Sequence, residues 1–178
     1  AQASVNAAMD IGVARQLFNN CISAATILKT DADKVKLWKK MLADMPDYLV
    51  NEKGALKEWA TPLLADNESH RHCSHLYALY YGIPDEMATN TKLLNAFDEA
   101  LKVKINLRRR EFKGESVNGR PPGEMAFGLV LQGFVSASLR KADVCAELVD
   151  WLSNKYWNPN FASLHNPGNI FNTDISGG

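Results

Sequence analysis

The sequence predicts an all-α protein built from helical hairpins, and three observations support this prediction. Apolar residues recur at spacings of three and four through most of the chain. Clusters of Gly, Pro and Asn separate these periodic stretches. The sequence shows neither a convincing set of alternating strands nor a βαβ pattern. A length of 178 residues with 46% hydrophobic residues suits a single domain over residues 1–178 with a substantial core.

The N-terminal part predicts a hairpin of two helices. Apolar positions at helical spacing predict the first helix over residues 5–28, with Ser4 as a possible cap. The second is expected to begin at Asp31 or Ala32 and to end at residue 45, before Pro46. The stretch "NEKGALKEW" that follows predicts a turn and a short extended segment.

The remaining elements are predicted in the same way. A short helix over "SHLYALYY" is ended by Gly82 and Pro84, and a longer helix follows over residues 86–110. Two more helices are expected over residues 124–139 and 142–156, the first apolar on all sides and therefore buried all round. Hairpins with long loops at one end suggest an α/α toroid or part of one, and function usually resides in such loops.

The net charge, the lengths of the apolar runs and the absence of common catalytic motifs argue against several classes of function. The formal net charge is zero, so neither a nucleic-acid-binding surface nor an acidic tail is indicated. No apolar run approaches the roughly 20 residues that span a bilayer, so no membrane partner is expected. Common nucleotide, zinc-protease and serine-hydrolase motifs do not occur, and no cofactor is predicted. The chain lacks an initiator Met, which suggests a segment of a longer protein of unknown location.

The stretch "NESHRHCSH" concentrates the chemistry of the chain. His70, His72 and His75 stand beside Arg71 and Cys73, which allows three interpretations. The histidines and the cysteine could bind zinc, although the spacing is not a standard one. The imidazoles could instead cap a helix and satisfy buried carbonyl groups. The third interpretation is a polar substrate pocket, which Arg71 favours because a guanidinium repels a metal ion but donates several hydrogen bonds to hydroxyl groups. All three cysteines of the chain are expected to be buried or free thiols (Cys21, Cys73 and Cys145).

Two further places carry carboxylates of interest. In "LKEW", Glu58 precedes Trp59, a pair that suits saccharide binding because an indole face stacks on C–H groups while a carboxylate accepts hydroxyl protons. Read alone, the pair also fits an exposed acid beside a core tryptophan. Near the C-terminus Asp174 precedes two glycines, where Asp most often forms a turn or caps a helix.

Several segments, in order, resemble one family. "MDIGVARQLFNNCISAATIL", "GALKEW", "HRHCSHLYALYYGIP" and "NPGNIFNTDISGG" are similar to the catalytic domain of glycoside hydrolase family 95, whose members include α-L-fucosidases and α-L-galactosidases. The resemblance implies an (α/α)6 barrel, of which this chain would be about the C-terminal half. It implies an inverting enzyme in which Asp174 is the catalytic base. It places Arg71, His72, Glu58 and Trp59 against the substrate, an oligosaccharide carrying α-linked L-fucose or a related L-sugar.

The resemblance also marks what this chain lacks. The family's general acid and its water-positioning asparagines are expected upstream of residue 1, so the isolated chain is expected to be inactive or nearly so. The missing half of the domain, or a second copy of the chain, is expected to cover exposed apolar helix faces. A departure occurs at "GEMAFGLVL", where many members have Gly-Trp-Ser, and it bears on fucose specificity. A non-catalytic helical carbohydrate-binding or scaffold module is the alternative, and a secreted or periplasmic parent protein is one possibility.

Overall fold

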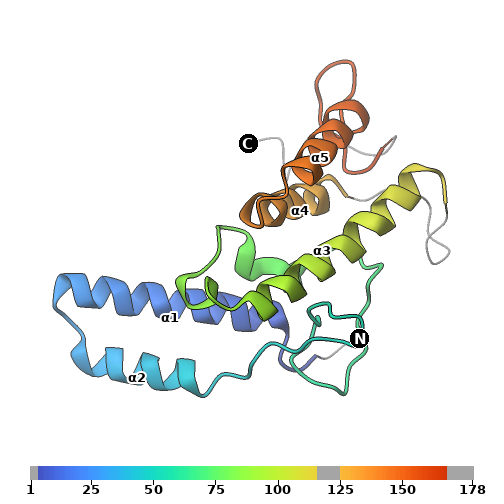
Figure 1. Ribbon diagram of the computed structural model, residues 1–178. Helices are drawn as coiled ribbons and strands as arrows, with labels where there is room; N and C mark the ends of the chain where they lie inside the picture. Colours follow the sequence, from blue (N-terminus) through green and yellow to red (C-terminus); the bar gives the residue numbers. More distant parts are fainter. Residues whose placement is uncertain (1–3, 116–124, 168–178) are drawn as a thin grey trace.

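The computed structural model describes residues 4–115 and 125–167, and these residues are almost entirely helical and loop (Figure 1). Pairing between extended segments is limited in this part of the chain to three isolated β-bridges. The all-α prediction is therefore confirmed, while the (α/α)6 arrangement stays a prediction. The helices are α1 (Ala8–Leu28), α2 (Ala32–Ala43), η1 (Ser74–Leu79), η2 (Asp85–Met87), α3 (Thr91–Phe112), α4 (Ala126–Ser138) and α5 (Ala142–Lys155).

Helices α1 and α2 form the expected hairpin, which projects from the rest of the chain (Figure 1). The turn contains two residues in the left-handed region, Lys29 with φ 54° and Asp31 with φ 53°. Asp31 therefore precedes the second helix instead of beginning it. None of the residues of α2 is buried, so tertiary packing holds this helix only weakly.

The predicted helix over residues 86–110 is two elements. A 3-10 turn, η2, comes first, and α3 then begins at Thr91 because Asn90 caps it, its side chain accepting a hydrogen bond from the N–H of Leu93 at 3.0 Å. The helix expected at "SHLYALYY" is likewise a 3-10 helix, η1, and is shorter than predicted. Helix α3 contributes many of the buried residues, and its buried face packs against η1, η2 and α4.

Helix α4 differs from its prediction. It packs against α3, α5 and η1 with one face, on which Leu129 and Val135 are fully buried. The side chain of Phe134 on the same helix is 47% exposed. The expectation of burial all round was therefore wrong for the described residues, because nothing among them covers the second side of the helix.

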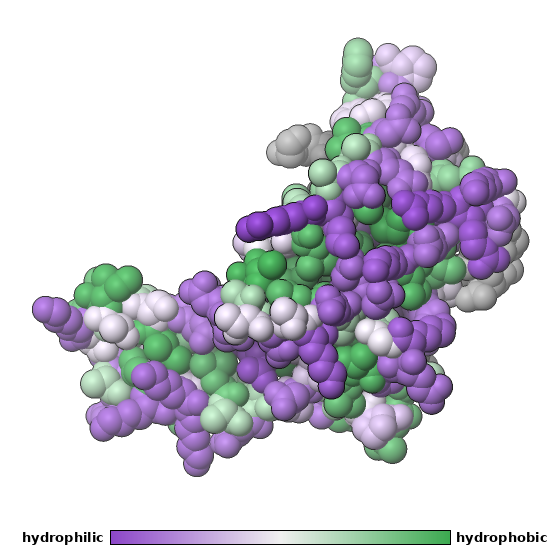
Figure 2. Space-filling model, in the orientation of Figure 1, coloured by the Kyte–Doolittle hydropathy of each residue, from purple (hydrophilic) through white to green (hydrophobic). Residues whose placement is uncertain are grey.

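Helix α1 also leaves apolar side chains uncovered. Met9, Val13 and Leu17 follow one another at four-residue spacing and are exposed, Leu17 by 56%. Figure 2 shows hydrophobic residues on the surface of the α1–α2 hairpin. None of the helices that the structure describes combines the length and the apolar character needed to cross a bilayer.

Candidate functional site

A pocket of about 430 Å³ lies where the start of α1, the loop before η1 and η1 itself meet. We call it the histidine pocket. It brings together three of the five residues that the family resemblance assigns to the site: Glu58, Trp59 and His72. Asp174 lies outside the described residues. The remaining lining residues are Ser4, Ala7, Met9, Leu64, Ala65, Asn67, His70, Ser74 and His75.

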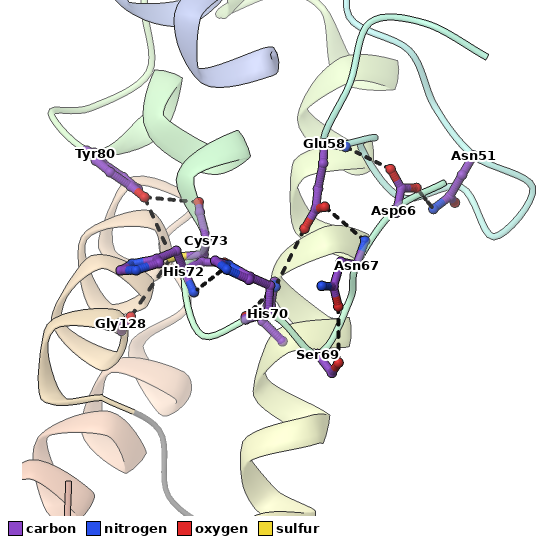
Figure 3. A network of polar contacts seen from close by, with 11 residues as sticks. Asn51, Glu58, Asp66, Asn67, Ser69, His70, His72, Cys73, Tyr80 and Gly128 are labelled. Atoms are coloured by element: carbon purple, nitrogen blue, oxygen red, sulfur yellow. Dashed lines mark hydrogen bonds and ion pairs between the residues drawn. The ribbon is translucent and has the colours of Figure 1, made fainter. Parts of the chain in front are cut away.

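Backbone pairing with the start of α1 fixes the Glu58–Trp59 pair. The N–H of Ala8 donates to the carbonyl oxygen of Glu58 at 2.9 Å, and Trp59 forms an isolated antiparallel bridge with Ala7. On the other side, Oδ1 of Asp66 accepts from the N–H of Glu58 at 2.9 Å, while its Oδ2 accepts from Asn51 at 3.1 Å (Figure 3). The pair is thus held from two directions before any ligand arrives.

The Glu58 carboxylate is mostly buried and has two partners within the protein. The backbone N–H of Asn67 donates to Oε2 at 2.9 Å, and Nζ of Lys104 lies 3.9 Å from Oε1. Burial raises the pKa of Glu58 above its ordinary value, whereas the Asn67 hydrogen bond and the Lys104 charge oppose this rise. A carboxylate in this setting can accept hydrogen bonds from hydroxyl groups.

His70 and His72 form a close pair with ring centroids 5.2 Å apart. The backbone N–H of His72 donates to Nδ1 of His70 at 3.2 Å, which orients the His70 ring (Figure 3). Burial lowers the pKa of both histidines, and the charge of Lys104 adds to the effect on each of them. Each neutral imidazole already accepts one hydrogen bond, His70 from the N–H of His72 and His72 from Nε of Arg71, so each ring offers its remaining N–H as a donor to a hydroxyl group.

His75 lines the same pocket but is a buried residue at the start of η1. Burial lowers its pKa to about 3, with a further contribution from the Lys104 charge. The ring is therefore neutral at physiological pH. The N-cap residue of η1 is Cys73, and its side chain forms no capping hydrogen bond.

Arg71 is exposed and is not one of the residues that line the pocket. Its Nε lies 3.4 Å from Nε2 of His72, so it touches the pocket through that ring. Its role toward a substrate stays a prediction. His72 also meets the ring of Phe127 at 6.3 Å, and the N–H of Ala126 binds the carbonyl oxygen of His165 at 2.9 Å. The C-terminal segment therefore reaches the neighbourhood of His72 by residue 165.

Sequence reasoning missed Lys104, which is 1% exposed. Its Nζ donates to the carbonyl oxygens of His70 and His72 at 2.9 and 3.2 Å. A signal was present, because Lys104 falls on the buried face of α3 between Leu101 and Ile105. A lysine in an apolar register is rare unless its ammonium group finds partners.

The described residues do not support the metal interpretation of the histidine stretch. Across residues 4–115 and 125–167, no three His, Cys, Asp or Glu side chains gather in an arrangement that could hold a metal ion. Cys21 and Cys145 are free thiols and Cys73 is a buried thiol, which agrees with the expectation of buried or free thiols. Cys73 is the buried one, and its carbonyl oxygen accepts a hydrogen bond from Tyr80 at 3.0 Å.

Comparisons with known proteins agree with the resemblance. The family model described as glycosyl hydrolase family 95 catalytic domain matches residues 1–174. Alpha-L-fucosidase 2 of Arabidopsis thaliana is 29% identical over 103 residues. That match covers 57% of this chain and 12% of the relative, so the chain spans only a small part of the length of the curated protein it matches.

Proposed function

The chain belongs to glycosyl hydrolase family 95, and from this membership we propose that it forms part of an inverting glycoside hydrolase for α-linked L-fucose or a related L-sugar. The observation that carries the proposal is the histidine pocket, which gathers an acid, an indole and a histidine pair around one cavity. In our proposal Glu58 and His72 bind sugar hydroxyl groups and Trp59 packs on the C–H face of the ring. Arg71 supports them from beside His72.

The pocket's two kinds of wall suit such a ligand. Glu58, Asn67 and His72 supply donors and acceptors, while Ala7 and Leu64 are apolar. A sugar presents hydroxyl groups and C–H groups together, and small-molecule sites combine apolar walls with a few polar groups that fix orientation. Because the sugar carries no charge, directional hydrogen bonds have to hold it.

The reaction needs two further groups. In an inverting hydrolase one carboxylic acid protonates the leaving oxygen and a base activates water on the opposite face, with the two groups roughly 6.5–9.5 Å apart. We propose Asp174 as the base, on the strength of its motif position, and an acid upstream of residue 1. The base must be ionised and the acid protonated at the working pH.

The test restores the upstream region and measures hydrolysis of aryl α-L-fucoside and aryl α-L-galactoside. Asp174→Asn is expected to lower kcat by roughly a hundredfold or more, because a positioned base contributes about 10²–10⁴-fold. Asp33→Asn is the matched control, since this aspartate is exposed on α2. Product stereochemistry followed by NMR then tests inversion.

The alternative is a module that binds saccharide without hydrolysing it. Binding of L-fucose with no turnover in the upstream-extended protein would favour this alternative. Robust hydrolysis by the 178-residue chain alone would contradict the proposed division of the catalytic groups between two segments.

A further inference from the structure

We propose that Lys104 is a positioning residue that joins the two polar walls of the histidine pocket and places one positive charge between them. Its ammonium group contacts the carboxylate wall at Glu58 and the backbone of the histidine wall at His70 and His72. The inference rests on the proposed function, in which these walls bind a sugar.

The geometry places one cation between two short segments of the same loop. Nζ of Lys104 lies 2.9 and 3.2 Å from the carbonyl oxygens of His70 and His72, and 3.9 Å from Oε1 of Glu58. Figure 3 shows the Glu58 carboxylate pointing toward the part of the loop that carries His70 and His72. The loop between Glu58 and His72 contains no regular helix or strand, so long-range contacts have to fix its shape.

A lysine can hold the loop at this position, whereas an apolar residue could not bind its carbonyl oxygens or the carboxylate. Its ammonium group has three donors and no acceptor. Burying it costs several kcal/mol unless partners compensate, and the two carbonyl groups and the carboxylate are such partners. Because Lys104 is on α3, its contacts tie the loop to a 22-residue helix.

The same cation also sets the electrostatics of the pocket. It opposes the effect of burial on the pKa of Glu58, and it adds to the effect of burial that lowers the pKa of His70, His72 and His75. Other charged groups each affect the pKa of only some of these residues: Asp66 affects Glu58 and His75, Glu68 affects Glu58, Arg71 affects His70 and His72, His72 affects His70, and His165 affects His72. Lys104 is the only residue among these that acts on all four groups, so it favours an ionised acid beside neutral imidazoles.

The first test needs no catalytic activity. The C–H resonances of His70 and His72 are titrated by NMR in the 178-residue chain and in Lys104→Met, with Lys102→Met as the control. Lys102 is exposed on the same helix and pairs with Asp98 and Glu99. We expect Lys104→Met to raise the pKa of both histidines and Lys102→Met to leave them unchanged. Equal histidine pKa values in the two variants would overturn the proposal.

A second measurement covers the case in which Lys104→Met does not fold. In the unmodified chain, the ammonium protons of Lys104 should exchange slowly with water and show couplings to the carbonyl carbons of His70 and His72. Fast exchange like that of exposed lysines would overturn the geometry on which the proposal rests. The conservative Lys104→Arg should keep the low histidine pKa values, since the charge remains.

The third test uses the upstream-extended protein on aryl α-L-fucoside. We expect Lys104→Met to raise KM by roughly tenfold or more, the order expected for losing charged hydrogen bonds. The acid limb of the kcat/KM profile should move to higher pH, because Glu58 and the histidines protonate more readily. An unchanged KM and profile in an active enzyme would overturn the role of Lys104. Inactivity of the unmodified protein would instead count against the proposed function, while the NMR titration still decides on Lys104.

Discussion

The backbone N–H of Asn67 donates a hydrogen bond to Oε2 of Glu58 at 2.9 Å, which closes the loop between them. The bond aligns the carboxylate before a ligand binds, and it draws Asn67 into the lining of the histidine pocket. Preorganisation of this kind lowers the entropy cost of binding.

Glu58→Gln should weaken binding of L-fucose to the upstream-extended protein by roughly tenfold to a hundredfold. The change removes a charged acceptor whose hydrogen bonds are worth about 1.5–3 kcal/mol, and it removes the counter-charge of Lys104. Calorimetric titration measures the effect. Glu68→Gln is the control from the same loop, since Glu68 pairs with Lys53 outside the pocket. Equal losses in both variants would contradict a direct role for Glu58.

Trp59→Ala should weaken binding more than Trp59→Phe. An aromatic ring contributes about 0.5–1.5 kcal/mol beyond its buried area, or roughly 2- to 13-fold in affinity, and Phe keeps much of that contribution. The backbone bridge to Ala7 does not involve the indole, so both variants should fold. Fluorescence-detected or calorimetric titration with L-fucose checks the order. If Trp157→Ala, a substitution outside the pocket, weakened binding as much, stacking at Trp59 would be refuted.

His75 should make the fold acid-sensitive. Its pKa is about 3 in the folded chain against an ordinary 6.5, so between these values the unfolded chain binds the extra proton. Stability is therefore complete above pH 6.5 and is lost as the pH falls toward 3, by up to about 1.4 kcal/mol per pH unit. Urea unfolding at pH 7.5, 6.0 and 5.0 measures this slope. In His75→Gln, which does not titrate, the slope should be shallower, and an equal slope would contradict the prediction.

The isolated 178-residue chain should self-associate through α1. Met9, Val13 and Leu17 form an exposed apolar stripe that we expect the remaining half of the barrel to cover in a longer protein. Sedimentation velocity over a range of concentrations tests this. The double change Val13→Glu and Leu17→Glu should give a monomer, whereas Lys36→Glu on α2 should not. A monodisperse monomer of the unmodified chain would be the contrary result.

Periodicity predicted the helices better than it predicted their ends. The first hairpin and the last two helices begin and end within three residues of their expected positions. The break at Asn90 was missed because a cap acts through one side chain and leaves the apolar pattern on both sides intact. The 3-10 geometry of η1 was missed for a related reason: a six-residue element is too short for its period to distinguish 3.0 from 3.6 residues per turn.

The candidate site was predicted in part. Residue chemistry identified Glu58, Trp59 and His72, and the structure places them in one pocket. Lys104 could be found only by noticing a cation within an apolar register. Its partners are backbone oxygens 32 and 34 residues away, which no side-chain motif encodes. Asn67 was also missed, because its backbone N–H, and not its side chain, donates the hydrogen bond to the carboxylate of Glu58.

The residues of helix α2 are all at least partly exposed. The chain should therefore have two groups of amide hydrogens that differ in their protection against exchange with water. Amide hydrogens of α2 should exchange through local fraying of the helix, whereas those of α3 should exchange only when the core unfolds. A single melting temperature would then describe the body around α3 and overlook the outer hairpin helix. For the same reason, α2 is the natural place to attach a dye or a surface tether without disturbing the cavity at the other end of α1.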